Sequence, residues 1–201
     1  MNILITGANG QLGNEMRILS ARHAQHTYFF TDVEELDITS REAVNRFVKD
    51  NAIDIIVNCA AYTNVDKAES DEVLAHKINA LAVENLGVSG ARVIHVSTDY
   101  VFSGDACVPY EETDKVAPRT AYGRTKLAGE ELLQVVCPEA IIIRTAWLYS
   151  TFGNNFVKTM LRLGQEREAL GVVFDQIGSP TYAADLAMAI FAAIEAPEWH
   201  A

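Results

Sequence analysis

The stretch NILITGANGQLG, residues 2–13, places a short apolar strand directly before a glycine-rich turn. Its three glycines, Gly7, Gly10 and Gly13, are spaced G-x-x-G-x-x-G, and a helix is expected to follow over residues 10–22. A strand, a tight glycine turn and a helix in this order form the first unit of a parallel α/β sheet. The stretch therefore predicts an α/β fold whose first loop lies at the carboxyl end of a strand.

The same alternation of strand and helix continues along the chain. Strands are predicted over residues 2–6, 27–31, 53–57, 91–96, 140–144 and 171–174. Helices are predicted over residues 10–22, 40–50, 70–87, 119–136, 154–167 and 183–195. Strands separated by helices pair in parallel through right-handed crossovers, so we predict a Rossmann-like, doubly wound parallel sheet with flanking helices. Ligands of such sheets bind beyond the carboxyl ends of the strands, and functional residues are expected there.

The composition of the 201-residue chain excludes several classes of protein. Acidic residues outnumber basic ones 27 to 16, and the net charge of -11 disfavours binding to nucleic acid. The longest apolar runs are too short to span a bilayer, and the N-terminus lacks the basic region of a signal peptide. Three cysteines and five histidines are scattered, so we predict free thiols, no metal site and a cytoplasmic protein with no membrane partner.

The glycine pattern favours a dinucleotide ligand. Gly7 would allow the tight turn out of the strand, and Gly10 would let backbone N–H groups approach a pyrophosphate. Gly13 would let the helix pack close to the strand, and the helix N-terminus adds a favourable dipole. The alternative is a glycine-rich turn that binds nothing.

Asp32 ends the second predicted strand, 19 residues after Gly13. A carboxylate at this position accepts hydrogen bonds from ribose hydroxyls and repels a 2′-phosphate. Glu34, Glu35 and Asp37 make the neighbourhood more acidic, which favours NADH over NADPH. A solvated loop acid is the alternative reading of Asp32.

Small or polar residues follow two further strands. The third strand runs into Asn58-Cys59-Ala60-Ala61-Tyr62, where small side chains would let a cofactor lie against the edge of the sheet. The fourth runs into Ser97-Thr98-Asp99, where the Thr98 hydroxyl would hydrogen-bond a carbonyl oxygen and Asp99 would orient a sugar hydroxyl. Packed turns and a Ser/Thr turn motif are the structural alternatives.

Tyr122 and Lys126 form a Y-x-x-x-K pair at the start of a predicted helix. Residues four apart share a helix face. A nearby ammonium lowers the pKa of a tyrosine, and such a pair can give a proton to a carbonyl oxygen as hydride reaches the carbon. The lysine can also bind the nicotinamide ribose.

Taken together, these motifs resemble the extended short-chain dehydrogenase/reductase superfamily over nearly the whole chain. More narrowly, the chain is similar to the dTDP-4-dehydrorhamnose reductase family. The stretches that carry this closer similarity are VDKAE at 65–69, STDYVF at 97–102, YGRTKLAGE at 122–130, RTAWLY at 144–149 and GNNFV at 153–157. Several long matches in the right order make the resemblance specific.

The resemblance implies reduction of the C4 keto group of dTDP-4-dehydro-L-rhamnose by NADPH or NADH. It implies that Tyr122 is the proton donor with Lys126 as its partner, and that Thr98 polarises the carbonyl. Thr98 and Asp99 would contact the sugar, and Trp147 would border the same pocket. For the cofactor, the implied contacts come from Gly10, Gln11 and Leu12 to the pyrophosphate, from Asp32, Asp37 and Ile38 to the adenosine, and from Ala60, Ala61 and Tyr62 along its length.

Members of this family are longer than this chain, and their C-terminal part forms a smaller lobe over the nucleotide sugar. We therefore expect a C-terminally truncated chain, in which residues 1–201 form the NAD(P)-binding Rossmann domain and the substrate lobe is mostly absent. The resemblance allows a homodimer, but the Mg²⁺-assisted dimer contact of some members is not expected in this shorter chain.

Two alternatives stay open. One is another extended short-chain sugar-nucleotide enzyme, an epimerase or a 4,6-dehydratase, which retains NAD through its cycle. Dehydratases need an extra acid beside the threonine, but here Asp99 is followed by Tyr100. The other is a non-catalytic dinucleotide-binding subunit, similar to the relative that regulates methionine adenosyltransferase. The intact set of Thr98, Tyr122 and Lys126 favours an enzyme.

Overall fold

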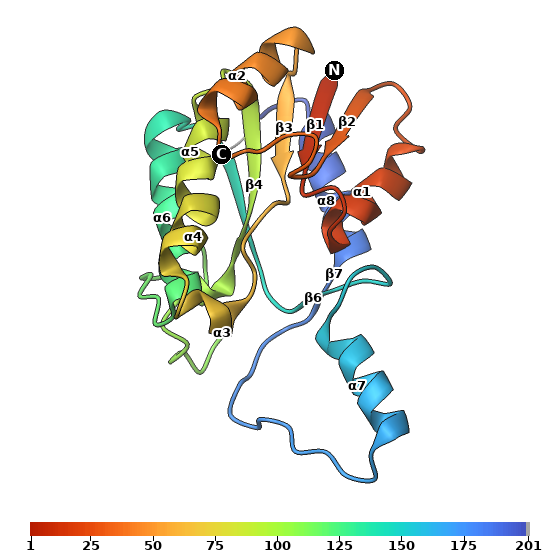
Figure 1. Cartoon of the computed structure of the whole chain (residues 1–201), viewed down its shortest axis with the longest axis vertical. Helices are drawn as coiled ribbons and strands as arrows, with labels where there is room; N and C mark the ends of the chain where they lie inside the picture. Colours follow the sequence, from red (N-terminus) through yellow and green to blue (C-terminus); the bar gives the residue numbers. More distant parts are fainter. Residues whose placement is uncertain (200–201) are drawn as a thin grey trace.

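A five-stranded sheet, in which every strand runs parallel to its neighbours, forms the centre of the molecule (Figure 1). The computed structural model describes residues 1–199, so the last two residues of the domain predicted over 1–201 lie outside the described residues. The strands are β1 (Asn2–Thr6), β2 (Thr27–Thr31), β3 (Ile55–Asn58), β4 (Arg92–Thr98) and β5 (Ile141–Thr145). Their order in space is β2-β1-β3-β4-β5, which confirms the predicted Rossmann-like sheet.

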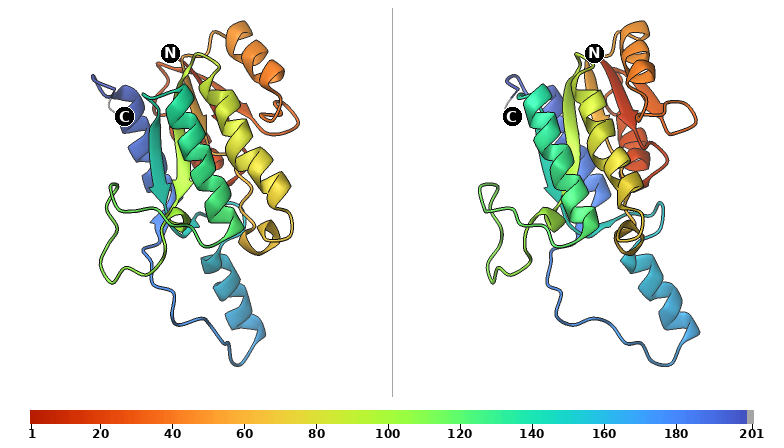
Figure 2. Two further views of the ribbon diagram at one scale, coloured as in Figure 1. Left: turned by 90° about the vertical axis from the view of Figure 1, so that its left-hand side faces the viewer. Right: turned by 60° about the vertical axis from the view of Figure 1, so that its left-hand side comes forward.

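Helices cover both faces of this sheet. The helical elements are α1 (Gln11–Ser20), α2 (Arg41–Asp50), α3 (Val65–Ala68), α4 (Glu72–His76), η1 (Lys77–Leu81), α5 (Ala82–Gly87), η2 (Asp99–Val101), α6 (Ala121–Val136), α7 (Phe156–Glu166) and α8 (Ala183–Glu195). Figure 2 shows α5 and α6 in front of the sheet and α8 behind it. Helix α2 packs against α5, and α1 packs against α8. Every connection between consecutive strands of the sheet passes through a helix, as parallel pairing requires.

The core forms on both faces because the inner strands are almost wholly apolar. Successive residues of a strand point to opposite faces. Leu4 and Ile56 therefore pack on the side of α2 and α5, whereas Ile3, Ile5 and Ile55 pack on the side of α1 and α8. All five are fully buried, and each such side chain contributes roughly 1.5–3 kcal/mol to stability. This packing fixes where the carboxyl ends of the strands lie.

The prediction of one continuous helix over residues 70–87 is wrong. A π-helical turn, η1, interrupts it at Lys77–Leu81 and separates α4 from α5. The wider turn shifts the face that the segment presents to α6, so Ala75 and Ala80 are buried while Val73 is 87% exposed. Small residues on this face allow the segment and α6 to approach closely.

The predicted sixth strand over residues 171–174 is also wrong. Val173 and Phe174 are 67% and 98% exposed, and the described part of the chain places no strand beside them. Instead, β6 (Leu148–Tyr149) and β7 (Thr181–Tyr182) form a separate two-stranded parallel sheet. Strand-forming residue types do not suffice here, because a strand is stabilised mainly by its cross-strand neighbours.

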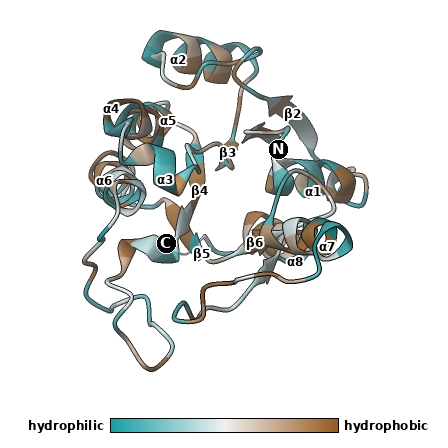
Figure 3. Ribbon diagram, turned by 60° about the horizontal axis from the view of Figure 1, so that its bottom comes forward, coloured by the Kyte–Doolittle hydropathy of each residue, from teal (hydrophilic) through white to brown (hydrophobic). Residues whose placement is uncertain are grey.

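Helix α7 projects beyond the carboxyl edge of the sheet (Figure 1). Figure 3 turns this edge toward the viewer and shows both apolar and polar residues along the helix. None of its side chains is buried, and Phe156 and Leu161 are 56% and 66% exposed. Among the described residues, no helix combines the length and the apolar character that crossing a membrane demands.

Gly129→Ala is expected to lower the free energy of unfolding by about 1–3 kcal/mol. Gly129 lies on α6 where this helix meets η1, and an added Cβ atom would overlap the carbonyl oxygen of Asn79. Gly164→Ala on the exposed helix α7 is the matched control, because an added Cβ there meets open space. In that position alanine raises stability by up to ~1 kcal/mol. Urea unfolding measures both variants, and equal midpoints would contradict the packing of α6 on η1.

Candidate active site at the carboxyl edge of the sheet

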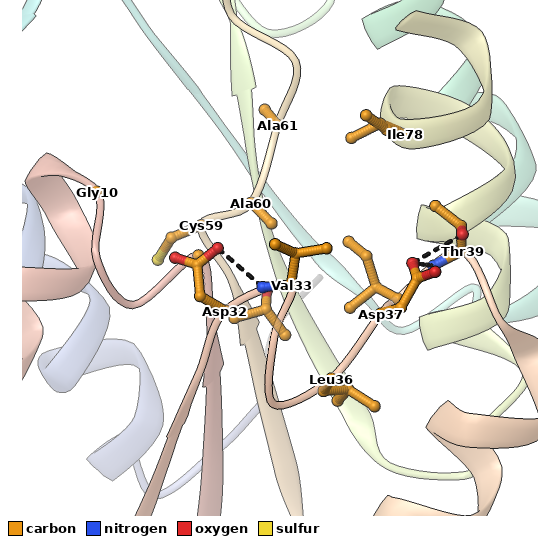
Figure 4. Close-up of a pocket in the computed structure, with 13 residues that line it drawn as sticks. Gly10, Asp32, Val33, Leu36, Asp37, Thr39, Cys59, Ala60, Ala61 and Ile78 are labelled. Atoms are coloured by element: carbon orange, nitrogen blue, oxygen red, sulfur yellow. Dashed lines mark hydrogen bonds between the residues drawn. The ribbon is translucent and has the colours of Figure 1, made fainter. Parts of the chain in front are cut away.

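A cavity of about 300 Å³ opens at the carboxyl ends of β1, β2 and β3. It lies at the boundary between β1 and β3, where the strand order reverses and where sheets of this kind bind ligands. Figure 4 shows that Asp32 and Asp37 lie at opposite sides of it. Its lining includes these residues predicted to bind the cofactor: Gly7, Gly10, Asp32, Asp37, Ile38, Ala60 and Ala61.

The glycine-rich turn after β1 packs tightly at the edge of the cavity. Gly7 has a φ of 62°, and a Cβ atom there would lie 2.7 Å from the backbone of Ala60. Gly13 is packed as closely against Ala8, so α1 begins directly behind the turn. Gly10 caps α1 without a side-chain hydrogen bond, and the first N–H groups of the helix therefore have no side-chain cap. Such a helix N-terminus favours a bound anion.

Asp32, directly after β2, is fixed at the rim of this cavity. Its carboxylate accepts hydrogen bonds from the backbone N–H groups of Asn9 at 3.1 Å and of Val33 at 2.9 Å. Each carboxylate oxygen retains a second lone pair, so Asp32 can also accept from two adjacent ribose hydroxyls. The cavity is lined by a second acid, Asp37, and by no lysine or arginine.

Lys77 brings a positive charge to the acidic end of the cavity. Hydrogen bonds from the hydroxyl and the backbone N–H of Thr39 lower the pKa of Asp37, and the charge of Lys77 lowers it further. Lys77 lies on η1. It was not predicted as a site residue, because the spacing of residues in this segment does not indicate that it faces the cavity.

The other predicted cofactor-binding residues do not line this cavity. The side-chain amide of Gln11 hydrogen-bonds β6 and the N-cap of α7, and Leu12 is buried in the core beside α8. Tyr62, Tyr122 and Lys126 belong to a second group further along the same edge.

Asn79, in the π-turn η1, joins the loop after β3 to helix α6. Its side chain accepts a hydrogen bond from the N–H of Tyr62 at 2.8 Å and donates to the carbonyl oxygen of Tyr62 at 3.1 Å. It also donates to the hydroxyl of Thr125 at 3.2 Å. Since Asn79 is buried, these bonds set the spacing between the cavity and α6. The sequence analysis missed this residue, although π-turns often occur at functional sites.

Thr98 ends β4 and lies beside Tyr122, in the first turn of α6. The Thr98 hydroxyl donates to the Asp99 carboxylate at 3.1 Å and accepts from the N–H of Tyr100 at 3.2 Å. It also lies beside the phenol of Tyr122. The rings of Tyr100 and Tyr122 meet edge to face, with centroids 5.5 Å apart. The structure thus brings Thr98, Asp99 and Tyr122 together at one strand end.

The phenol of Tyr122 is held in its neutral form. Burial raises its pKa to about 12, the hydrogen bond with Thr98 opposes this, and the charge of Asp99 adds to it. Burial also raises the pKa of Asp99 itself. Lys126 is not among the causes of this shift, and the pairing of Tyr122 with Lys126 stays a prediction. A neutral phenol remains able to donate a proton.

Lys126 points toward β4 rather than toward the phenol. Its amine donates to the carbonyl oxygen of Val96 at 2.8 Å and lies 3.2 Å from Nε2 of His95. Burial lowers the pKa of Lys126 to about 8, and the negative charge of Glu130 partly offsets this. Helical spacing places Lys126 on the face of Tyr122, but the length of its side chain lets the amine reach a different partner.

Trp147 follows β5 on the same edge. In the sheet, Thr145 of β5 lies opposite Thr98 of β4, so Trp147 comes two residues beyond that level. Its φ of 48° is unfavourable for any residue but glycine, and strain of this kind is concentrated at functional sites. Its side chain is 41% exposed. In the described residues, no three His, Cys, Asp or Glu side chains gather in a way that could hold a metal ion.

The parallel doubly wound sheet, with a glycine turn after β1 and an acid after β2, places this chain in the Rossmann-like class of α/β proteins. Residues 1–201 match the family model described as RmlD substrate binding domain. The chain belongs to this family.

Named relatives agree with this assignment. The dTDP-4-dehydrorhamnose reductase of Escherichia coli K12 is 48% identical over 195 residues, which are 93% of this chain and 64% of that protein. A crystal structure of a dTDP-4-dehydrorhamnose reductase from Clostridium acetobutylicum is 47% identical, with a TM-score of 0.93, over 97% of this chain and 70% of that one. The Bacillus anthracis enzyme of the same name, in complex with NADP, is 45% identical with a TM-score of 0.92, over 96% and 70%. The chain spans less than two thirds of the length of the E. coli relative.

In the cofactor-free protein, Tyr122 is expected to stay protonated up to about pH 10, where an exposed tyrosine is half ionised. Its pKa near 12 means that the fold stabilises the neutral phenol. This stabilisation is present below the unfolded pKa and is lost as pH rises through the folded pKa. An NMR titration of tyrosine ring carbons, with Tyr122→Phe to assign the signal, measures the midpoint. A midpoint at or below that of a free tyrosine would contradict the burial described here.

Proposed function

We propose that this chain forms the dinucleotide-binding part of an NAD(P)H-dependent reductase. The reaction is reduction of the C4 keto group of dTDP-4-dehydro-L-rhamnose to the alcohol of dTDP-L-rhamnose. The observation that carries the proposal is the placement of Thr98, at the end of β4, beside Tyr122, at the start of α6, on the same sheet edge as the glycine-lined cavity. The names of relatives at 45–48% identity support the choice of substrate.

The residues present fit a dinucleotide. Gly7 has no room for a side chain because it lies directly against the backbone of Ala60, and both residues line the cavity. The uncapped start of α1 would face the pyrophosphate, and Asp32 would accept from the adenosine ribose. Backbone N–H groups at Gln11 and Leu12 would serve the phosphates, because the side chains of these two residues point elsewhere. The N–H of Gly10 donates to the carbonyl oxygen of Gly7 at 3.0 Å, so Gly10 would contribute its lack of a side chain.

The chemistry of the keto group follows from the Thr98 and Tyr122 hydroxyls. When bound, reduced nicotinamide supplies the hydride that reaches C4. Tyr122, neutral because it is buried, gives its phenolic proton to the C4 oxygen as the C=O double bond becomes a single bond. The Thr98 hydroxyl hydrogen-bonds the same oxygen and shares the charge that develops on it. Asp99 and Trp147 would border the sugar, and Lys126 would hold the nicotinamide ribose.

The remaining features of the proposed enzyme rest on the family resemblance. Residues 1–201 would be the nucleotide-binding domain, and the substrate lobe of the longer relatives would complete the sugar site. The enzyme would act in the cytoplasm, where nucleotide sugars are made, and a homodimer is its expected assembly. Binding of NADH is favoured by Asp32, and Lys77 near Asp37 offers a positive charge to NADPH.

Tyr122→Phe is expected to lower turnover by a factor on the order of 10²–10⁴, because the variant lacks the proton that the C4 oxygen receives. Nicotinamide binding should be unchanged. The loss of reduced-nicotinamide absorbance after addition of dTDP-4-dehydro-L-rhamnose measures turnover, with NADH and NADPH run separately. The assay is made on this chain and on a chain extended to the length of its relatives.

Tyr28→Phe is the matched control, since it removes a phenolic oxygen from β2, where Tyr28 donates to the carbonyl oxygen of His23. Equal turnover of wild type and Tyr122→Phe would refute the proton-donor role. An extended chain that is inactive with this sugar but carries tightly held NAD would favour an epimerase. An extended chain that binds the dinucleotide but turns over no keto sugar would favour a regulatory subunit.

Asp32→Ala is expected to shift cofactor preference toward NADPH. The variant loses a charged acceptor for the ribose hydroxyls and the repulsion of a 2′-phosphate, so the ratio of the NADH and NADPH dissociation constants should change by about tenfold or more. Nicotinamide fluorescence measures both constants without turnover. Asp50→Ala, at the exposed end of α2, is the matched control because it removes the same charge outside the cavity lining. An unaltered ratio in Asp32→Ala would show that Asp32 does not face the ribose.

A further inference from the structure

His95 lies fully buried in β4, between Asn58 on β3 and Lys126 on α6. Its Nδ1 atom is 2.9 Å from Nδ2 of Asn58, and its Nε2 atom is 3.2 Å from Nζ of Lys126. Each ring nitrogen therefore faces a side-chain nitrogen. In each contact one nitrogen must donate and the other must accept, so the two contacts together determine where the protons lie.

The amide of Asn58 can face His95 in only one orientation. Its Oδ1 atom accepts a hydrogen bond from the backbone N–H of Ala60 at 3.2 Å and from the hydroxyl of Thr6 at 2.7 Å. A backbone N–H is only a donor, so the oxygen must stay on that side. The NH₂ group of Asn58 therefore points at His95 and donates to its Nδ1 atom.

A neutral His95 whose Nδ1 accepts must carry its proton on Nε2. This N–H points at the amine of Lys126, and only the neutral amine has a lone pair to accept it. An ammonium has three donors and no acceptor. The N–H groups of a charged Lys126 would therefore face the Nε2–H group of His95, with no acceptor between them. The second contact of the amine, to the carbonyl oxygen of Val96 at 2.8 Å, is available to both forms.

We propose that His95 is a positioning residue for Lys126: held by Asn58 with its proton on Nε2, it fixes the lysine amine against β4 and favours release of the lysine proton. The inference rests on the proposed function in so far as Lys126 belongs to the proposed site there. It gives Asn58 and His95 a role in the site although neither lies among the residues predicted to contact substrate or cofactor.

The charges around Lys126 act on its proton in both directions. Burial lowers the pKa of Lys126, and Glu130, one turn further along α6, raises it. Arg144 on β5 pairs with Glu130 at 2.6 Å and so weakens that opposing effect. Burial and the charge of Lys126 hold the pKa of His95 well below its ordinary value, which keeps the ring neutral.

The other elements packed against α6 also carry titratable side chains. They are Asp66 and Lys67 on α3, Glu72 and His76 on α4, Lys77 on η1, Glu84 on α5, Asp99 and Tyr100 on η2 and Arg92 on β4. Glu72 pairs with Arg124 on the exposed side of α6. Among the titratable groups of β4, His95 is the one placed in contact with the lysine amine.

The first test is the position of the proton in the wild-type, cofactor-free chain. Long-range ¹H–¹⁵N correlation of histidine rings distinguishes a protonated from an unprotonated nitrogen. Above the midpoint of the Lys126 titration, His95 is expected to carry its proton on Nε2 and none on Nδ1. Through the titration, its ring signals should shift with the same midpoint as the Lys126 side-chain carbons while the ring stays neutral. A proton on Nδ1 at the alkaline end, or ring signals that ignore the lysine, would overturn the proposal.

The second test changes the partner of the amine. In His95→Gln the amide oxygen can accept from an ammonium, so the Lys126 midpoint should rise by roughly one pH unit or more, a tenfold gain in proton affinity. His76→Gln, the same substitution on the exposed helix α4, is the matched control and should leave the midpoint unchanged. Equal midpoints in His95→Gln and wild type would refute the role of His95. If His95→Gln does not fold, the proton position in the wild-type chain still decides the matter.

Neither measurement requires turnover, so the two proposals can fail separately. An extended chain that does not reduce the keto sugar but shows both titrations would refute the reductase and leave the role of His95 standing. A chain that turns over while His95 carries its proton on Nδ1 would refute the role of His95 alone.

Discussion

A buried side-chain amide must have hydrogen-bond partners, and Asn58 of β3 has them on the neighbouring strands β1 and β4 and in the loop after β3. Its oxygen accepts from Thr6 at the end of β1 and from the backbone just beyond β3, while its NH₂ group meets His95 on β4. Leaving one such group unpaired costs roughly 1–3 kcal/mol. A slip of any of these strands would break at least one bond. The carboxyl ends of β1, β3 and β4 are therefore held level, and Gly7 stays directly against Ala60 beside the cavity.

Most of the fold can be read from the sequence because most of it follows from apolar runs. Strands such as Ile55–Asn58 are buried on both faces, and their β-branched residues bounded by turns leave little alternative to a parallel sheet. The predictions from sequence fail where contacts with neighbouring elements determine the local structure. Residues 171–174 have strand-forming side chains and no strand beside them. The segment 70–87 has a helical period, but close contact with α6 is accommodated by a π-turn that periodicity does not reveal.

The site shows the same division between local pattern and tertiary contact. The rule that functional residues follow strands placed Asp32 at the cavity, and put Thr98 and Asp99 beside Tyr122. This rule did not predict Asn79 or His95. Each is a polar residue inside an otherwise apolar element, and its position in the sequence does not indicate which residue it contacts. The direction of Lys126 was missed for a related reason. Helical spacing determines the helix face that carries Lys126. The position of its amine is determined by the hydrogen bond to the carbonyl oxygen of Val96.

Residues 167–180 connect α7 to β7 without helix or strand, and Phe174 and Ile177 within them are almost wholly exposed. Proteases cut segments of this kind first, and insertions and new termini are best tolerated in them. Beyond the segment, α8 buries Ile190, Phe191 and Ile194 in the core that it shares with α1. A chain nicked there would hold its last helix by noncovalent contacts alone: this packing, the pairing of β7 with β6 and the ion pair of Glu195 with His23. The molecule is thus suited to division into two fragments that reassemble without a peptide bond between them.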